Sequence, residues 1–112
     1  MIRVSIASTE NRLKGVAQAL QLIDSDILIP DRPVMVKPNF VTTTNQLAAT
    51  HVDATRATLE YLYGRGVNEF VIAVGPALGT PDSGFDNYGY RDLANEYKIE
   101  FMDLNTDDSI PV

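Results

Sequence analysis

The sequence predicts an α/β domain of three-layer, Rossmann-like form, ordered β-α-β-α-β-α-β around a mainly parallel sheet of about four strands. Short β-branched runs alternate with stretches of helical periodicity, which is the pattern of such folds. The length of 112 residues, 45% of them hydrophobic, suits one domain over residues 1–112. Because helical crossovers between parallel strands are right-handed, we expect helices on both faces of the sheet.

The first strand and the first helix are predicted at the N-terminus. Residues 2–6 alternate β-branched and polar side chains, which indicates a strand with one face more exposed than the other. Apolar residues then recur at steps of three and four over residues 13–23, which predicts an amphipathic helix. Ser8 or Thr9 can cap the start of this helix.

The second strand and helix follow the same order. The run 34–36 is short and apolar, which is typical of a buried parallel strand. Residues 40–49 are polar and longer than an ordinary connection, so they form a candidate functional loop. Thr50 and Asp53 have the spacing of a capping box, and Gly64 and Gly66 are expected to end the helix that they begin.

The C-terminal half contains the clearest strand. Residues 70–74 are five apolar residues in a row, so we expect this strand to be central. Residues 75–89 hold four of the seven glycines and two prolines, which predicts a second long loop without regular structure. A short helix over 90–97, a fourth strand over 99–104 and a polar tail are expected after it.

A sheet of four strands leaves exposed edges, which proteins usually cover. A second copy of the chain, as in a homodimer, or a missing C-terminal segment of a longer protein would cover one of them. The sequence leaves both alternatives open.

Composition excludes several classes of protein. The absence of cysteine rules out a disulfide scaffold, a thiol nucleophile and an iron–sulfur cluster ligated by this chain. The formal charge of −6 argues against nucleic acid and anionic membrane as partners. Apolar runs are too short for a membrane span and a signal peptide is not recognisable, so we expect a cytoplasmic location.

Polar residues and glycines gather where the predicted strands end. Ligands of open parallel sheets bind at the carboxyl ends of the strands, so these residues are candidates for holding a small anionic molecule. The candidate ligand-binding residues are Lys37, Asn39, Ser8, Thr50, Gly75, Gly79, Thr80 and Asp103.

Several of these candidates also have a structural interpretation. Lys37 can bind a phosphate or carboxylate, or it can pair with Asp103. Asn39 can orient a ligand or close an Asx turn. The segment 75–80 reads G-x-x-x-G-T, which matches neither the dinucleotide fingerprint nor the phosphate loop. Its glycines allow an anion-binding nest, and a plain surface loop is the alternative.

His51 is the one histidine of the chain, and it falls in the first turn of the second predicted helix. The positive end of the helix dipole favours a neutral ring, which can accept a proton or bind a metal. A metal site would need Asp53 or Asp103 as further ligands, and a capping or surface role is the alternative. Serine, histidine and acid do not show nucleophile-elbow spacing, so catalytic residues and enzymatic activity stay unassigned.

Four sequence elements resemble the domain-of-unknown-function 362 (DUF362) family: 34–41 with its Lys-Pro-Asn, Ala49-Thr50-His51, the Gly-Pro step in 71–76, and 89–93. The resemblance implies an α/β domain with Lys37, Asn39, Thr50 and Gly75 as recurring positions around a pocket. Family members are typically longer, and many carry a four-iron four-sulfur segment, whose cysteines this chain lacks.

Two hypotheses about function follow. The first is that the chain is the ligand-binding part of an enzyme or iron–sulfur redox protein, with a small anionic metabolite at the strand ends. The alternative is a non-catalytic module for interaction or assembly, because the thin sheet leaves an edge free.

Overall fold

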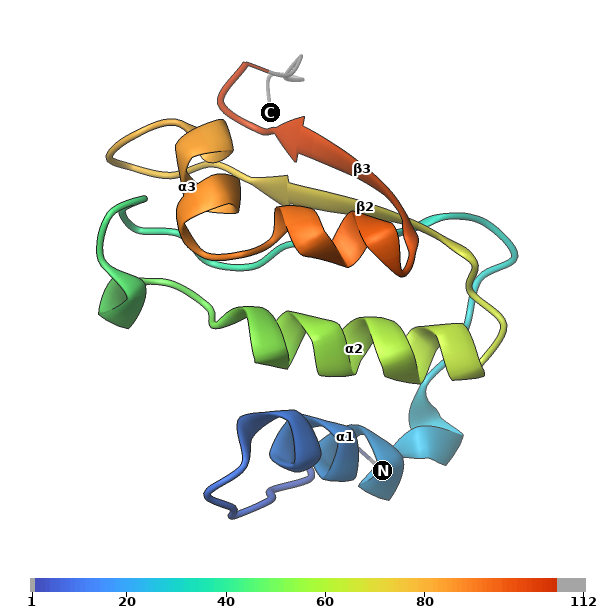
Figure 1. Ribbon diagram of the computed structural model, residues 1–112. Coiled ribbons are helices and arrows are strands. Elements are labelled where there is room, and N and C mark those ends of the chain that lie inside the picture. Colours follow the sequence, from blue (N-terminus) through green and yellow to red (C-terminus); the bar gives the residue numbers. More distant parts are fainter. Residues whose placement is uncertain (1, 107–112) are drawn as a thin grey trace.

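The computed structural model describes residues 2–106 and contains a parallel three-stranded sheet in the order β1-β2-β3 (Figure 1). The strands are β1 (Val34–Val36), β2 (Glu69–Val74) and β3 (Lys98–Asp103). The α/β class, the parallel sheet and the central position of the apolar run in β2 are therefore confirmed. A fourth strand and Rossmann-like wrapping are not confirmed.

Three α-helices and three short 3₁₀ helices accompany the sheet. They are α1 (Arg12–Leu22), η1 (Asp24–Asp26), η2 (Gln46–Ala48), α2 (Val52–Gly64), α3 (Pro81–Asn87) and η3 (Arg91–Asn95). No helix of residues 2–106 is both long enough and apolar enough to cross a membrane.

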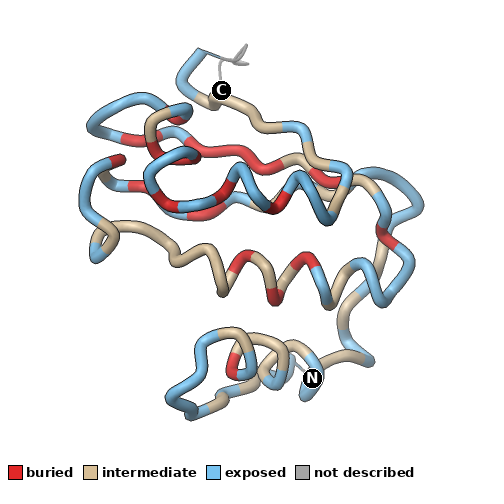
Figure 2. The backbone as a smooth tube through the Cα atoms, viewed as in Figure 1, coloured by how far each residue is buried: buried red, intermediate tan, exposed pale blue. Residues whose placement is uncertain are grey.

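The core lies on one face of the sheet. Figure 2 shows buried residues along β2 and in the middle of α2, on the side that faces the strands and on the side that faces α1. Three alternate side chains of β2 form a cluster with one side chain each from α2, α3 and η3: Phe70, Ile72 and Val74 with Leu59, Phe85 and Leu93. The connection from β1 to β2, which contains α2, and the connection from β2 to β3, which contains α3 and η3, therefore cover the same face of the sheet. Right-handed connections in the order β1-β2-β3 require this. Met35, on the opposite face, is 52% exposed, and α1 packs against α2.

The predicted first strand is wrong, because residues 2–6 pair with no strand in the part of the chain that the structure describes. Ile2, Val4 and Ile6 are 94%, 83% and 86% exposed. The polar residues between them hold the segment along α1 and η1: Arg3 Nε donates to Asp26 at 2.6 Å, and Ser5 Oγ donates to the Ala19 carbonyl at 2.6 Å. The alternation of apolar and polar residues in 2–6 therefore belongs to an extended segment that contacts α1 and η1, and not to a strand of the sheet.

The start of α1 also differs from the prediction. Asn11 is the N-cap, and its side-chain oxygen accepts a hydrogen bond from the Lys14 backbone N–H at 3.0 Å. Thr9 instead accepts from the Asn11 N–H and lies two residues before the cap. Ser8 and Thr9 are therefore not the cap.

The prediction that residues 75–89 lack regular structure is also wrong, because this segment contains α3. Thr80 caps the helix by accepting from the Ser83 N–H at 3.3 Å, and Pro81 occupies the first helical turn. The Thr-Pro pair was the sequence signal for this start. The short helix predicted over 90–97 is the 3₁₀ helix η3, and the predicted tail lies mostly outside the described residues.

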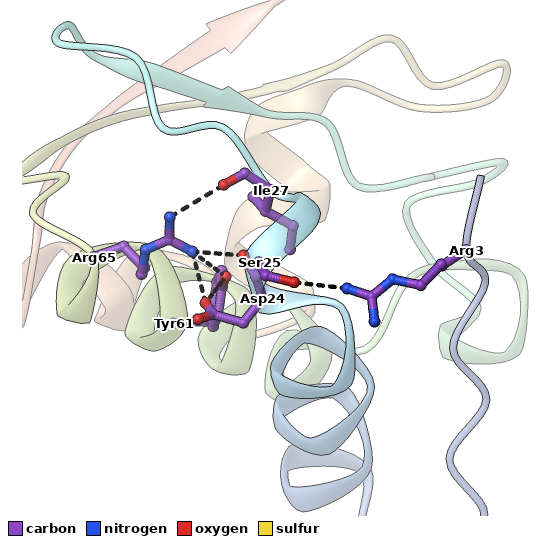
Figure 3. A network of polar contacts seen from close by, with 6 residues as sticks. All are labelled: Arg3, Asp24, Ser25, Ile27, Tyr61 and Arg65. Carbon is purple, nitrogen blue, oxygen red and sulfur yellow. Dashed lines mark hydrogen bonds and ion pairs between the residues drawn. The ribbon is translucent and has the colours of Figure 1, made fainter. Parts of the chain in front are cut away.

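A polar network ties η1 to the C-terminal end of α2 (Figure 3). The Arg65 guanidinium donates to the Asp24 carboxylate at 2.6 Å and to the Ile27 carbonyl at 3.1 Å. Tyr61 also donates its hydroxyl hydrogen to Asp24. This Tyr61 hydrogen bond, followed by the contact with Arg65, lowers the pKa of Asp24. The network anchors the N-terminal part of the chain to α2.

Candidate functional site

The carboxyl ends of the three strands share one rim of the sheet. β1 pairs with β2 up to Val36, and β2 pairs with β3 up to Val74 and Asp103. Because all pairs are parallel, Lys37 and Gly75, which follow β1 and β2, emerge on the same rim as Asp103. The candidate residues from these three strands therefore lie on one side of the molecule.

Lys37 is exposed on this rim and forms no ion pair with a carboxylate of the described residues. Asp103, the partner considered from the sequence, instead accepts the Asn105 backbone N–H at 2.8 Å. A depression of about 240 Å³ lies beside Lys37, and Thr50 also lines it. Val16 of α1 and Ala54 of α2 form part of its walls.

Asn39 and Thr50 are joined across the base of the loop between them. The Asn39 N–H donates to the Thr50 hydroxyl oxygen at 2.9 Å, and the Thr50 N–H donates to the Asn39 carbonyl at 2.8 Å. An antiparallel bridge between Phe40 and Ala49 continues this pairing. Two residues that are eleven positions apart in sequence are thereby held together next to Lys37.

His51, and not Thr50, is the N-cap of α2. Its Nδ1 accepts a hydrogen bond from the Asp53 N–H at 3.0 Å, which requires an unprotonated Nδ1. The predicted capping box is therefore wrong, because the Thr50 hydroxyl faces Asn39 instead. Among residues 2–106, no three histidine or acidic side chains are grouped so as to hold a metal ion. The geometry gives His51 a capping role.

Tyr90 is a buried residue that was not among the predicted site residues, and it holds this corner in place. Its hydroxyl donates to the Thr50 carbonyl at 2.8 Å and lies 2.9 Å from the Thr55 hydroxyl. Burial raises the pKa of Tyr90 to about 12, so the phenol stays protonated and keeps its hydrogen for Thr50. A tyrosine that begins a predicted helix gave no signal of this long-range contact.

We expect Tyr90→Phe to lower the free energy of unfolding by about 1–3 kcal/mol, because the Thr50 carbonyl and the Thr55 hydroxyl lose their partner. Urea unfolding measures the change. Tyr63→Phe is the matched control, since Tyr63 is exposed and on the surface of α2. Equal stability of both variants would show that the Tyr90 hydroxyl does not support this corner.

The segment 75–80 makes close contacts with its neighbours. Asn105 Nδ2 donates to the Pro76 carbonyl at 2.9 Å, beside Gly75. The N–H groups of Ala77 and Leu78 both donate to the Val41 carbonyl at 3.2 Å. These two backbone donors are thus already paired with the protein, so they are not free to form the predicted anion nest.

The structure separates the candidate residues into groups. Lys37, Asn39 and Thr50 lie together, while Gly75 and Asp103 meet around Asn105. Gly79 packs against Thr43, and Thr80 caps α3. Ser8 is exposed in the segment before α1 and is not part of the sheet. The first group combines a cation, a hydroxyl and a depression, so it is the strongest candidate site.

Comparison with known proteins identifies one family. The model of the family described as "Domain of unknown function (DUF362)" matches residues 34–112, which begin at the first residue of β1. No curated protein and no solved structure matches the chain. The matched range includes every sequence element on which the resemblance was based, from the Lys-Pro-Asn step to residues 89–93. The match covers most of the sequence, and the chain therefore belongs to the DUF362 family.

Proposed function

We propose that this domain binds a small anionic molecule, a phosphate or a carboxylate, at the carboxyl rim of the sheet. The observation that carries the proposal is the position of Lys37. It is an exposed cation directly after β1, it has no acidic partner among the described residues, and it lines a depression. In a chain of net charge −6, a lysine that is left without a carboxylate at such a position is available for a ligand.

Thr50 supplies a second polar group to the same depression. Its hydroxyl oxygen accepts from the Asn39 N–H, while its hydroxyl hydrogen has no acceptor in the described part of the chain. That hydrogen can be donated to an anion beside Lys37. The Tyr90 contact holds the Thr50 backbone, so the hydroxyl is kept in place before a ligand arrives.

The other threonines of the depression are already engaged. The Thr55 hydroxyl is bonded to Tyr90, and the Thr58 hydroxyl donates to the Ala54 carbonyl at 3.0 Å. Anion recognition would therefore rest on Lys37 and Thr50. We place this binding function in an enzyme or an iron–sulfur redox protein. Because this sequence has no cysteine, the ligands of such a cluster would come from outside it.

Replacing Lys37 by methionine tests the proposal. Inorganic phosphate and citrate are titrated against the wild-type protein, and thermal unfolding is followed at constant ionic strength. A ligand at a hundred times its dissociation constant stabilises the native state by about 2.7 kcal/mol. We expect Lys37→Met to abolish this stabilisation and to leave the anion-free protein folded.

Lys98→Met is the matched control. Lys98 is exposed at the amino end of β3, where it pairs with Glu69 at 2.7 Å, and it lies at the opposite end of the sheet from Lys37. This variant should keep the full response to anions. If the two variants respond alike, Lys37 is not the binding cation.

A further inference from the structure

Residues 2–6 have the properties of a β-strand without a partner. The segment is extended beside α1, with Arg3 and Ser5 bonded to η1 and α1. The alternate side chains Ile2, Val4 and Ile6 are almost fully exposed. Three large apolar side chains in one exposed row are unusual on a protein surface that faces only water.

The edge of the sheet at β1 has the complementary property. β1 pairs with β2 on one side, and within residues 2–106 its other side has no strand partner. The depression beside this edge has walls from Val36 of β1, Val16 of α1 and Ala54 of α2. The edge therefore offers free backbone donors and acceptors next to a hollow that apolar side chains line in part.

We propose that residues 2–6 of one copy add as an edge strand beside β1 of a second copy, and that the exchange is reciprocal in a homodimer. The period of two along a strand lets Ile2, Val4 and Ile6 share the helix-facing side with Val34 and Val36. There they would pack against the apolar side chains Val16, Val36 and Ala54 at the depression. Exchange of an identical segment between copies is a common route to dimers, and it removes both the exposed row and the free edge.

The size of the contact is sufficient for a stable dimer. Each valine or isoleucine side chain carries about 100 Å² of apolar surface. Two exchanged segments and the surfaces that they cover would bury roughly 1,200 Å², which exceeds the approximately 1,000 Å² of a specific interface.

The dimer goes beyond anion binding and can fail independently of it. Strand pairing along Val34–Val36 ends before Lys37, although Lys37 and Thr50 line the same depression as Val36. The two proposals therefore share this depression but depend on different residues: the dimer on residues 2–6, and anion binding on Lys37 and Thr50. A wild-type protein that is monomeric but still binds phosphate would contradict the dimer and not the proposed anion binding. A wild-type protein that is dimeric but does not bind phosphate would contradict anion binding and not the dimer.

Sedimentation of the whole chain tests the exchange. We expect a dimer for the wild-type protein and at least a tenfold weaker dimer for Val4→Lys, because the new positive charge would lie against Val16 and Val36 and near Lys37. Leu47→Lys is the control, since Leu47 is as exposed as Val4 but lies on η2. A monomeric wild-type protein, or equal weakening by both substitutions, would overturn the proposal. Both positions are exposed, so both variants should fold.

Disulfide trapping gives a second, independent test, because the chain has no cysteine of its own. Ser5→Cys and Met35→Cys are made in separate chains of different mass and mixed under mild oxidation. Ser5 and Met35 would lie on the same face of the extended sheet, so a mixed disulfide between the two chains is expected. Leu47→Cys in place of Met35→Cys should not form it.

The doubly substituted chain distinguishes exchange from folding back. If Ser5→Cys and Met35→Cys in one chain form an internal disulfide at high dilution, the segment reaches its own β1 and the exchange is wrong. Absence of that internal bond, together with the mixed disulfide between chains, supports the exchanged dimer.

Discussion

Replacing Phe40 by alanine is expected to lower the free energy of unfolding by about 3–5 kcal/mol, the usual cost of deleting a buried aromatic side chain. Phe40 is 3% exposed and lies three residues after Lys37. Its ring meets the rings of Phe85, Tyr88 and Tyr90 edge to face, with centroids 5.8, 5.1 and 5.1 Å away. The substitution removes the ring around which the other three are arranged.

The loss should also reach the candidate site. Phe40 adjoins Asn39 and pairs with Ala49, so it fixes the base of the loop that carries Thr50. We therefore expect Phe40→Ala to weaken the response to phosphate as well as the stability. Urea unfolding and the thermal response to phosphate measure the two effects.

Leu47→Ala serves as the control for the loop. Leu47 belongs to the same loop but is exposed, and surface substitutions usually change stability by no more than about 0.5 kcal/mol. A loss of less than about 1 kcal/mol for Phe40→Ala would contradict the central packing role of the ring.

Replacing Gly79 by alanine is expected to cost about 2–4 kcal/mol, from backbone strain and overpacking together. Gly79 has a φ of +89°, which side chains other than glycine rarely adopt. An added Cβ would lie 1.9 Å from the Thr43 hydroxyl oxygen. Thr43 is buried, so it has little room to move.

Gly66→Ala separates the two causes. Gly66 also has a positive φ, of +100°, but no atom lies within 4 Å of an added Cβ. This variant should show the strain alone, and urea unfolding of both proteins gives the difference. If Gly66→Ala costs as much as Gly79→Ala, contact with Thr43 does not constrain the segment after β2.

The local signals in the sequence predicted β1, β2, β3, α1 and α2 to within a few residues. They failed where a local pattern was compatible with two different structures. Residues 2–6 have the alternation of a strand, but their polar side chains bond to α1 and η1. Residues 80–81 lie in a glycine-rich stretch, and these glycines predicted a loop. The Thr80 cap and Pro81, which begin α3, indicated the helix instead.

The candidate site shows the same division. That Lys37 and Gly75 lie on one rim follows from parallel pairing, which the strand order along the chain predicts. The contact between Tyr90 and Thr50 joins residues forty positions apart and leaves no periodic trace in the sequence. The same is true of the bond between Arg65 and Asp24, which anchors the N-terminal segment.

The sequence by itself determined the α/β class, the central strand and the rim on which Lys37 lies, because periodicity and chain order act through neighbours in the chain. Only the tertiary structure decided which groups pair over long distances. In the folded chain, Asn11 and His51 are the N-caps of α1 and α2. Two backbone N–H groups of residues 75–80 donate to the Val41 carbonyl, and residues 2–6 lie outside the sheet. Such pairings depend on distances between atoms that no single stretch of sequence contains.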